Sequence, residues 1–331
     1  MKIVQIGHAG HCAYAYPGIV AHELDFCGIS SGNFGLEAEG IPNFCSSLHE
    51  KGLSPKLYKS WKEMLAVEQP DIVIVDSWFT DHGNIVLYAL EHGINVFCDK
   101  PVATDFETLA KISKCNRATL AAMFDMRVNP AFKAAKSAIV QGKIGKIRMM
   151  DSRKSYRLGK RPAFYSSRET YCGIIPWVAI HAIDWMKWIS GENYTSLGSA
   201  FISRLENGGN GDMDITSAAQ FLMTNDVIAT VTADMYRPSI APTHGDDRLR
   251  VVGTKGIVEI TDGKAALISD VTNEVSILPN EPAGDIFEDF LEQISGKSNY
   301  LTKESCIEST YWALKADEAA VNNLKNRQVS N

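Results

Sequence analysis

Lys100 is the residue whose type and position point most directly to chemistry. It follows the apolar run Val96–Cys98 and Asp99, and Pro101 comes directly after it. A buried strand thus delivers a lysine at its carboxyl end, and ligands of open α/β sheets bind beyond those ends. A lysine placed there is a candidate for catalysis. The competing interpretation is an ordinary solvated lysine, since isolated lysines are mostly exposed.

A second candidate is a histidine in the predicted helix 176–191, which has a proline near its start and a glycine at its end. Trp177, His181, Asp184 and Trp188 fall on one face of this helix. His181 is then either a core histidine bonded to Asp184 or an acid–base group whose ring Asp184 orients. Both interpretations stay open.

The third candidate is the loop after the first predicted strand, 2–6. Small residues at G-x-G-x-x-G spacing let a dinucleotide approach the backbone, but here only the first of the three positions is glycine. A plain strand–turn–helix competes with this interpretation. Pro17 is expected to interrupt the helix that follows. The loop residues that would contact a cofactor are Gly7, His8, Ala9, Gly10, His11 and Cys12.

The second predicted strand ends in Ser30 and Ser31, where a dinucleotide fold usually places an acid for the ribose 2′-hydroxyl. The serines either only form the turn or bond the ribose or a 2′-phosphate. Without an acid or an arginine there, we expect little discrimination between NAD and NADP.

The elements that must position these residues change character near residue 124. Up to 123, short apolar strands alternate with helices, which predicts a parallel sheet covered on both faces. From 124 to 331, strands with a period of two and turn residues between them predict a mainly antiparallel sheet with a few helices. The expected strands are 2–6, 24–30, 72–75, 95–98, 119–124, 146–156, 197–205, 217–223, 227–236, 248–252, 257–260 and 265–269, and the expected helices are 58–65, 130–141, 176–191, 286–294 and 304–323.

Composition is typical of a globular protein. The 331 residues are 45% hydrophobic and 22% charged, with a net charge of −6, which argues for two domains and against nucleic acid or anionic membrane as partner. No apolar run approaches the ~20 residues of a membrane span, and the N-terminus lacks a signal-peptide layout. Seven scattered cysteines without a C-x-x-C pair indicate reduced thiols in the cytoplasm and no metal site.

Three motifs together resemble the glucose–fructose oxidoreductase and inositol dehydrogenase family (Gfo/Idh/MocA). They are the segment 71–101 with its terminal Asp-Lys-Pro, the segment 126–132 (Met-Arg-x-Asn-Pro-Ala-Phe) and the turn 142–146 (Gly-x-Ile-Gly-Lys). The resemblance runs over nearly the full length. It implies an N-terminal Rossmann domain (1–123), a C-terminal domain for substrate binding and oligomerisation (124–331), a nicotinamide cofactor, and a dimer or tetramer through the second sheet.

Carried over residue by residue, the resemblance makes Lys100 the lysine near the nicotinamide and His181 the histidine of the family's Asp-x-x-x-His. Asp184 is a further catalytic candidate because of its place beside His181 on the predicted helix. Trp177 stands where that motif has its aspartate. The cofactor contacts expected beyond the loop and the serines are Ser77, Trp78, His82, Asp99, Lys100, Pro101 and Arg127.

Polar side chains on the second half suit a sugar-like substrate. The expected substrate contacts are Lys154, Tyr156, Trp177, His181 and His244. The alternative for these clusters is solvated loops and weak surface ion pairs. Trp177 is either a platform for a sugar ring or a buried core residue.

The sequence therefore predicts an NAD(P)-dependent oxidoreductase that moves a hydride to or from a hydroxyl-bearing carbon of a sugar or polyol. Two alternatives remain: a retained cofactor used for net hydrolysis or elimination, or a non-catalytic nucleotide or sugar sensor in which Trp177 has closed the catalytic position.

Overall fold

The computed structural model describes residues 1–297 and 300–329. Within it the chain forms two compact units. The first comprises 1–123, 169–172 and 285–310, and the second comprises 124–168, 173–284 and 311–329. The chain thus leaves the first unit after residue 123 and returns to it near the C-terminus. The expected functional domains, divided at residue 123, stay a prediction.

The first unit is built on a six-stranded parallel sheet, as predicted, with strand order β3-β2-β1-β4-β5-β6. Every residue of β4 is buried, because helices cover both faces of a parallel sheet. The carboxyl ends of its strands lie at one edge. The strands are β1 (Lys2–Gly7), β2 (Asp25–Ser30), β3 (Lys56–Leu57), β4 (Ile72–Asp76), β5 (Asn95–Cys98) and β6 (Leu120–Ala122).

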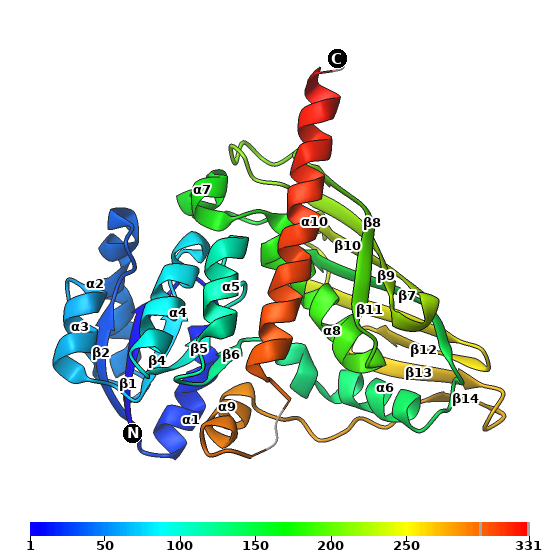
Figure 1. Cartoon of the computed structure of the whole chain (residues 1–331), viewed down its shortest axis with the longest axis horizontal. Coiled ribbons are helices and arrows are strands. Elements are labelled where there is room, and N and C mark those ends of the chain that lie inside the picture. The colour runs from blue at the N-terminus through cyan, green and yellow to red at the C-terminus, as the bar shows by residue number, and fades with distance from the viewer. Residues whose placement is uncertain (298–299, 330–331) are drawn as a thin grey trace. The chain divides into compact units, whose positions relative to one another are not determined.

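The helices of this unit follow its strands in a regular alternation (Figure 1). The last of them, α9, belongs to the returning segment, and its Phe287 and Phe290 pack on Phe97 of β5. The helices are η1 (Cys12–Ala15), α1 (Tyr16–Ala21), α2 (Gly35–His49), α3 (Trp61–Glu68), η2 (Phe79–Asp81), α4 (His82–Glu91), α5 (Phe106–Lys114) and α9 (Ile286–Ile294), and α7 (Arg168–Tyr171) belongs to it except for its first residue.

Two helix starts differ from the expectation for local reasons. The helix expected from residue 58 begins at Trp61, because the Ser60 hydroxyl caps it by accepting the Glu63 N–H. Pro17 lies in the first turn of α1 and so begins this six-residue helix instead of interrupting it. A first-turn proline costs little, since its missing N–H would have no partner there.

The second unit is built on an eight-stranded sheet with the order β14-β13-β12-β11-β7-β10-β9-β8. The sheet is mainly antiparallel, as predicted, and the β7–β10 pair is parallel. Residues of β9 and β10 alternate between buried and more exposed, so one face forms the core. Its strands are β7 (Ile147–Tyr156), β8 (Tyr194–Ser203), β9 (Thr216–Met223), β10 (Val227–Asp234), β11 (Gly245–Gly253), β12 (Gly256–Thr261), β13 (Lys264–Ser269) and β14 (Glu274–Ile277).

The core face of this sheet is covered by α6, α8 and the second-unit part of α10 (Figure 1). Trp312 of α10, for example, packs against Tyr194 and Phe221. The opposite face keeps apolar side chains exposed, namely Met149, Phe201, Leu222, Ile228 and Ile268. The helices are η3 (Asp125–Val128), α6 (Pro130–Val140), η4 (Ala163–Ser166), η5 (Ile175–Ala179), α8 (Ile180–Ser190), η6 (Thr224–Asp226) and α10 (Lys303–Val329).

The helix expected over 176–191 is in fact two elements. The first turn, η5, is a π-helix, and α8 continues it to Ser190. Gly191 ends α8 in a left-handed conformation, as its position predicted. The π turn changes the residue spacing, so Trp177 and His181 do not share a simple α-helical face. Such turns are frequent at functional sites.

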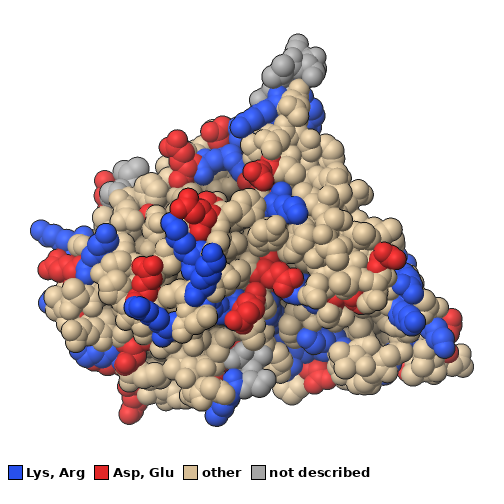
Figure 2. Space-filling model, in the orientation of Figure 1, with Lys and Arg blue, Asp and Glu red and all other residues tan. Residues whose placement is uncertain are grey.

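The described residues include no helix that is both long and apolar enough to cross a membrane. On the face shown in Figure 2, basic and acidic side chains are interspersed.

Candidate active site

Gly7 fixes the path of the loop that follows β1. Its φ is +83°, and a Cβ there would lie 2.2 Å from the Ser77 Cα. The loop therefore packs directly on the turn after β4, and only glycine permits this approach. The same turn receives a hydrogen bond from the Ala9 N–H to the Asp76 carbonyl, at 2.7 Å. Gly7 thus has the place and conformation that a dinucleotide loop requires.

Asp76, at the end of β4, is a site residue that the sequence reasoning missed. Its buried carboxylate accepts the His11 N–H through Oδ1 and the Cys12 N–H through Oδ2, both at 3.1 Å. Main-chain N–H groups at this position are those that a dinucleotide fold offers to the diphosphate. Asp76 therefore holds the loop in this conformation. It also competes with a bound diphosphate for the His11 and Cys12 N–H groups. The only sequence signal was an acid ending an otherwise apolar strand.

Lys100 is 1% exposed at the carboxyl end of β5. Its Nζ lies 3.8 Å from Oδ1 of Asp99 and 5.6 Å from the centre of the Phe79 ring. The same Asp99 oxygen accepts the Lys100 N–H at 2.8 Å and the His11 Nδ1–H at 3.0 Å. The solvated-surface interpretation of Lys100 is therefore wrong: the ammonium is held inside the protein, next to the loop, by a buried carboxylate.

The pKa values of the two buried acids at this edge of the sheet, Asp76 and Asp99, are shifted in opposite directions. Burial favours the neutral form of Asp99, but the charges of Lys100 and His11 outweigh it and hold the pKa of Asp99 below its usual range. Burial and the nearby Asp99 charge raise the pKa of Asp76. Two buried acids with opposite pKa shifts beside a buried lysine are an arrangement that supports proton transfer.

His82 ties the turn after β4 to the turn after β5. Its Nδ1 lies 2.9 Å from the Pro101 carbonyl and its Nε2 lies 2.8 Å from the Ser77 carbonyl, and the ring is fully buried. His82 therefore helps to fix the positions of Ser77 and Pro101, and its contact with a cofactor stays a prediction. The Lys100–Pro101 peptide bond between these turns is cis.

The end of β2 is richer in acids than its serines suggested. Ser30 and Ser31 are buried, and their hydroxyls donate to the main-chain carbonyls of Ser31 and Gly32. Glu37 of α2 accepts the Gly32 N–H at 2.7 Å, and Asp81 of η2 accepts the Asn33 N–H at 2.6 Å. Two acids thus reach the end of β2 from other elements, and sequence spacing gave no signal for them.

Two buried oxygens at this corner have no hydrogen-bond partner within the described residues: Oε1 of Glu37 and Oγ of Ser77. Burial, with the charges of Asp81 and Asp76, raises the pKa of Glu37 to about 8, although the Gly32 and Trp78 main-chain groups oppose the shift. Unsatisfied buried polar groups are rare and need an explanation. A ribose that donates its hydroxyls would supply one, so the residues present fit a nicotinamide dinucleotide here.

The remaining loop residues have mixed surroundings. The His8 ring packs on Phe44 of α2, and burial lowers its pKa. A Cβ on Gly10 would lie 2.0 Å from Oδ2 of Asp99, so this glycine admits the carboxylate. Trp78 stacks on Phe34, with ring centres 4.7 Å apart. Whether these residues contact a cofactor stays a prediction.

In the second unit, His181 lies beside an acid that was not predicted. Its Nδ1 is 4.0 Å from Oδ1 of Asp125, the first residue after the turn from β6. The two Asp184 oxygens instead bind Arg127, through Nε at 2.9 Å and Nη2 at 2.5 Å. Arg127 and Asp184 thus form a buried bidentate pair. Arg127 thus engages both Asp184 oxygens, and Asp125 is a second acid near the His181 ring. Orientation of that ring by Asp184 stays a prediction.

Lys154 and Tyr156 lie at the end of β7, where Asp247 and Asp125 act on both side chains. The Lys154 Nζ donates to Asp247 at 2.7 Å and lies 5.1 Å from the Tyr156 ring centre. Burial lowers the pKa of Lys154, but the electrostatic effects of Tyr156, Asp247 and Asp125 outweigh it and raise it overall. Lys154 is therefore a firmly charged, buried donor, and the solvated-loop interpretation does not apply to it.

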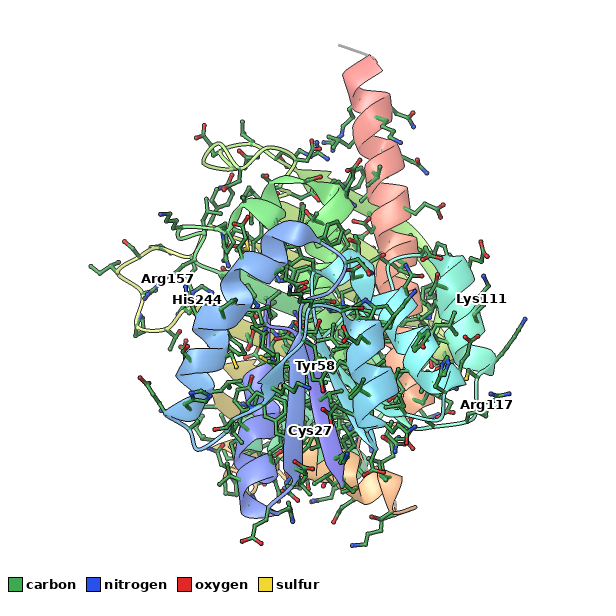
Figure 3. All side chains as sticks on the ribbon, turned by 90° about the vertical axis from the view of Figure 1, so that its left-hand side faces the viewer. Cys27, Tyr58, Lys111, Arg117, Arg157 and His244 are labelled. Carbon is green, nitrogen blue, oxygen red and sulfur yellow. The ribbon has the colours of Figure 1, made fainter. Side chains whose placement is uncertain are left out.

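His244 is exposed and stacks on Tyr156, with ring centres 5.0 Å apart. Its carbonyl accepts the Arg157 N–H at 3.1 Å, and the two residues lie together in Figure 3. Burial and the Arg161 and Arg157 charges lower the pKa of His244. Among the described residues, no group of three or more His, Cys, Asp or Glu side chains could hold a metal ion.

Trp177 is 5% exposed. Its ring centre lies 4.5 Å from that of Tyr165 and 5.2 Å from the Arg161 guanidinium carbon. The indole therefore packs against an aromatic ring and a cation of its own unit. A platform role, which needs an accessible face, stays a prediction.

Comparison with known proteins gives two family matches. Residues 38–123 match the model described as an oxidoreductase family with an NAD-binding Rossmann fold. Residues 132–259 match the GFO/IDH/MocA C-terminal domain. The first match begins at residue 38 and so does not include the Gly7 loop or β2.

Individual relatives agree with these matches. An inositol 2-dehydrogenase of Burkholderia ambifaria (strain MC40-6) is 26% identical over 223 residues, which cover 65% of this chain and 61% of that protein. The structure of a putative oxidoreductase from Thermotoga maritima is 41% identical, covers 98% of both chains and superposes with a TM-score of 0.91. A myo-inositol 2-dehydrogenase structure from Lactobacillus plantarum shares the fold at 20% identity, with 98% of both chains covered and a TM-score of 0.73.

Proposed function

Because this chain belongs to the Gfo/Idh/MocA oxidoreductase family, we propose that it is an NAD(P)-dependent oxidoreductase acting on the CH–OH group of a sugar or polyol. The observation that carries the proposal is the buried Lys100 ammonium. It is held by Asp99 at the same sheet edge as the Gly7 loop and the unsatisfied Glu37 and Ser77 oxygens. A cofactor and a proton-handling group would thus share one edge.

The residues of the first unit have distinct parts in this proposal. The Gly7 loop and the Glu37–Ser77 corner would hold the dinucleotide, which supplies or accepts the hydride when bound. Lys100 would hold the reacting hydroxyl oxygen by donating to it and would help to move its proton. Asp99 would keep the ammonium in position, since a buried Lys without a partner tends to lose its charge.

In the second unit, we propose His181 as the other acid–base group. Its Nδ1 lies 4.0 Å from Oδ1 of Asp125, a carboxylate that would orient the ring and stabilise its protonated form on closer approach. Asp125 would then do what the family's aspartate does at the position of Trp177. Lys154 and Tyr156 would donate and accept hydrogen bonds from substrate hydroxyls, which suits a polyhydroxy compound.

The names of the relatives support a polyol as the first substrate class to test. Several curated relatives are inositol 2-dehydrogenases, and the match to two of them, from Burkholderia, spans 61% of their length. We propose a cyclic polyol or a sugar and not one particular compound.

The test is cofactor binding followed by turnover. Calorimetric titration with NADH and NADPH should give saturable binding, and NAD(P)⁺ reduction should appear with at least one member of a polyol and sugar panel that includes myo-inositol. Lys100→Met should lower turnover about 10²–10⁴-fold, whereas Lys114→Met, at an exposed lysine of α5, should not. Absence of binding of both cofactors, or an unchanged rate in Lys100→Met, would refute the proposal.

One observation favours a second candidate function, that of a sensor without catalytic activity. Asp76 already takes the His11 and Cys12 N–H groups, which weakens the case for tight diphosphate binding. A protein that binds a sugar but shows no binding of either nicotinamide cofactor would support this candidate. Release of no reduced cofactor despite binding would instead support net hydrolysis or elimination with a retained cofactor.

The proposed assembly is a homodimer or homotetramer through the second sheet. Its outer face exposes Met149, Phe201, Ile228 and Ile268, and large exposed apolar surfaces commonly mark interfaces. All seven cysteines lie in the described part of the chain and none of them is in a disulfide. This suits the cytoplasm, which we propose as its location.

A further inference from the structure

We infer that Glu37 and Asp81 make the nucleotide site selective for NAD over NADP. The inference rests on the proposed function and extends it to the choice of cofactor. It departs from the sequence expectation of little discrimination, which considered only Ser30 and Ser31.

The two acids converge on the turn after β2 from separate elements. Glu37 lies in the first turn of α2, and Asp81 lies in η2 after β4. A Cβ built on Gly32 would lie 2.5 Å from Oδ2 of Asp81 and 2.8 Å from Oε2 of Glu37. Both carboxylates therefore reach the same point of the turn at which a dinucleotide fold binds the adenosine ribose.

The donors that could cradle a 2′-phosphate at this turn are already used. The Gly32 N–H binds Glu37 at 2.7 Å and the Asn33 N–H binds Asp81 at 2.6 Å. The Asn33 side-chain amide donates to the other Asp81 oxygen at 2.8 Å, and its own oxygen accepts from Trp61 at 3.0 Å. The turn is thus held in a form in which the Gly32 and Asn33 main-chain donors are already bound to the two acids.

The corner also has unused acceptor capacity. Glu37 is 3% exposed, Ser77 is fully buried, and neither Oε1 of Glu37 nor Oγ of Ser77 has a hydrogen-bond partner in the part of the chain that the structure describes. A buried carboxylate oxygen without a partner is costly, so a ligand that donates a hydroxyl group to Glu37 gains by binding here. The Ser77 hydroxyl can accept or donate in the same place. The ribose of NAD carries a 2′-hydroxyl donor. Above the Glu37 pKa of about 8, the 2′-phosphate of NADP has no such donor and brings negative charge next to two carboxylates.

The experiment is calorimetric titration of the whole protein with NADH and NADPH, at a pH above the Glu37 pKa of about 8. We expect NADH to bind roughly 100-fold more tightly, the ratio that corresponds to like charges about 5–6 Å apart in a partly screened site. Glu37→Gln keeps the shape of the side chain and should lower this ratio at least about tenfold. Glu39→Gln, at an exposed position of the same helix, should leave the ratio unchanged.

Each outcome bears on a different claim. Equal binding of the two cofactors, or tighter NADPH binding, would overturn the selectivity inference and leave the proposed function standing. Binding of neither cofactor would overturn both. A ratio unchanged in a folded Glu37→Gln variant would also overturn the inference, and the melting temperature of the variant shows whether it is folded.

Discussion

Glu37→Gln should make the protein more stable in alkaline solution but not in acid. The free carboxyl has an ordinary pKa of 4.5, and burial raises the pKa of Glu37 in the folded protein to about 8. Below about pH 4.5 the group is protonated in both states and contributes nothing. Between the two values the unfolded chain releases the proton and the folded chain keeps it, so stability falls as the pH rises and stays low above about 8.

The size of this effect follows from the two pKa values. Their difference of about 3.5 corresponds to about 5 kcal/mol of unfolding free energy that the carboxyl removes above pH 8. Glutamine has nearly the same shape and never ionises, so it escapes this loss. For a 331-residue chain the unfolding entropy near the midpoint is ~0.7 kcal/mol/K, and the gain is an increase of about 7 °C in melting temperature.

The assay is a set of melting curves of the parent, Glu37→Gln and Glu39→Gln between about pH 5 and about pH 9. The Glu37→Gln and parent midpoints should be close at the acid end and diverge towards the alkaline end. Glu39 is exposed on the same helix, so its variant should follow the parent throughout. Parallel curves for Glu37→Gln and the parent would refute the reasoning, because they would mean that Glu37 ionises alike in both states.

Three further predictions concern the second unit. Arg127→Met should lower the unfolding free energy by about 3–5 kcal/mol, since it leaves the Asp184 carboxylate buried without its bidentate partner; denaturant unfolding measures this, and the double variant with Asp184→Leu should recover much of the loss. If Asp125 orients His181, Asp125→Asn should lower kcat about tenfold or more and shift the acid limb of the pH–rate profile. If Asp125 has only a structural role, the variant should change the melting temperature and leave the pH–rate profile unchanged. Trp177→Ala should lower the unfolding free energy by about 3–5 kcal/mol, because the indole is 5% exposed; a loss below about 1 kcal/mol with an altered KM would instead support the platform role.

The local sequence was sufficient for most elements and for the fold class. Short apolar runs such as 72–75 and 95–98 have the same ends in the structure to within one residue, because a strand buried on both faces can contain few polar residues. The alternation in the second half likewise predicted the mainly antiparallel sheet. The first residues of helices were predicted less accurately, because they depend on single capping residues such as Ser60.

The sequence also located Lys100 at a strand end next to Asp99, because both follow the strand directly along the chain. It could not decide whether the ammonium was buried. That depended on Phe79 and His11, which come from other strand ends. The side chain of Lys100 gains its position from packing between elements, and packing is not a local property of the chain.

The acids around these residues were decided only by the tertiary structure. Asp76, Glu37, Asp81 and Asp125 each lie at an element end or in a turn, where an acid is usually solvated and carries no spacing signal. The fold brings them to the loop, to the turn after β2 and to His181. A carboxylate acts over a few ångströms, whichever element carries it. The chain by itself therefore determined the strands and the strand-end lysine, and only the folded arrangement determined which charges surround them.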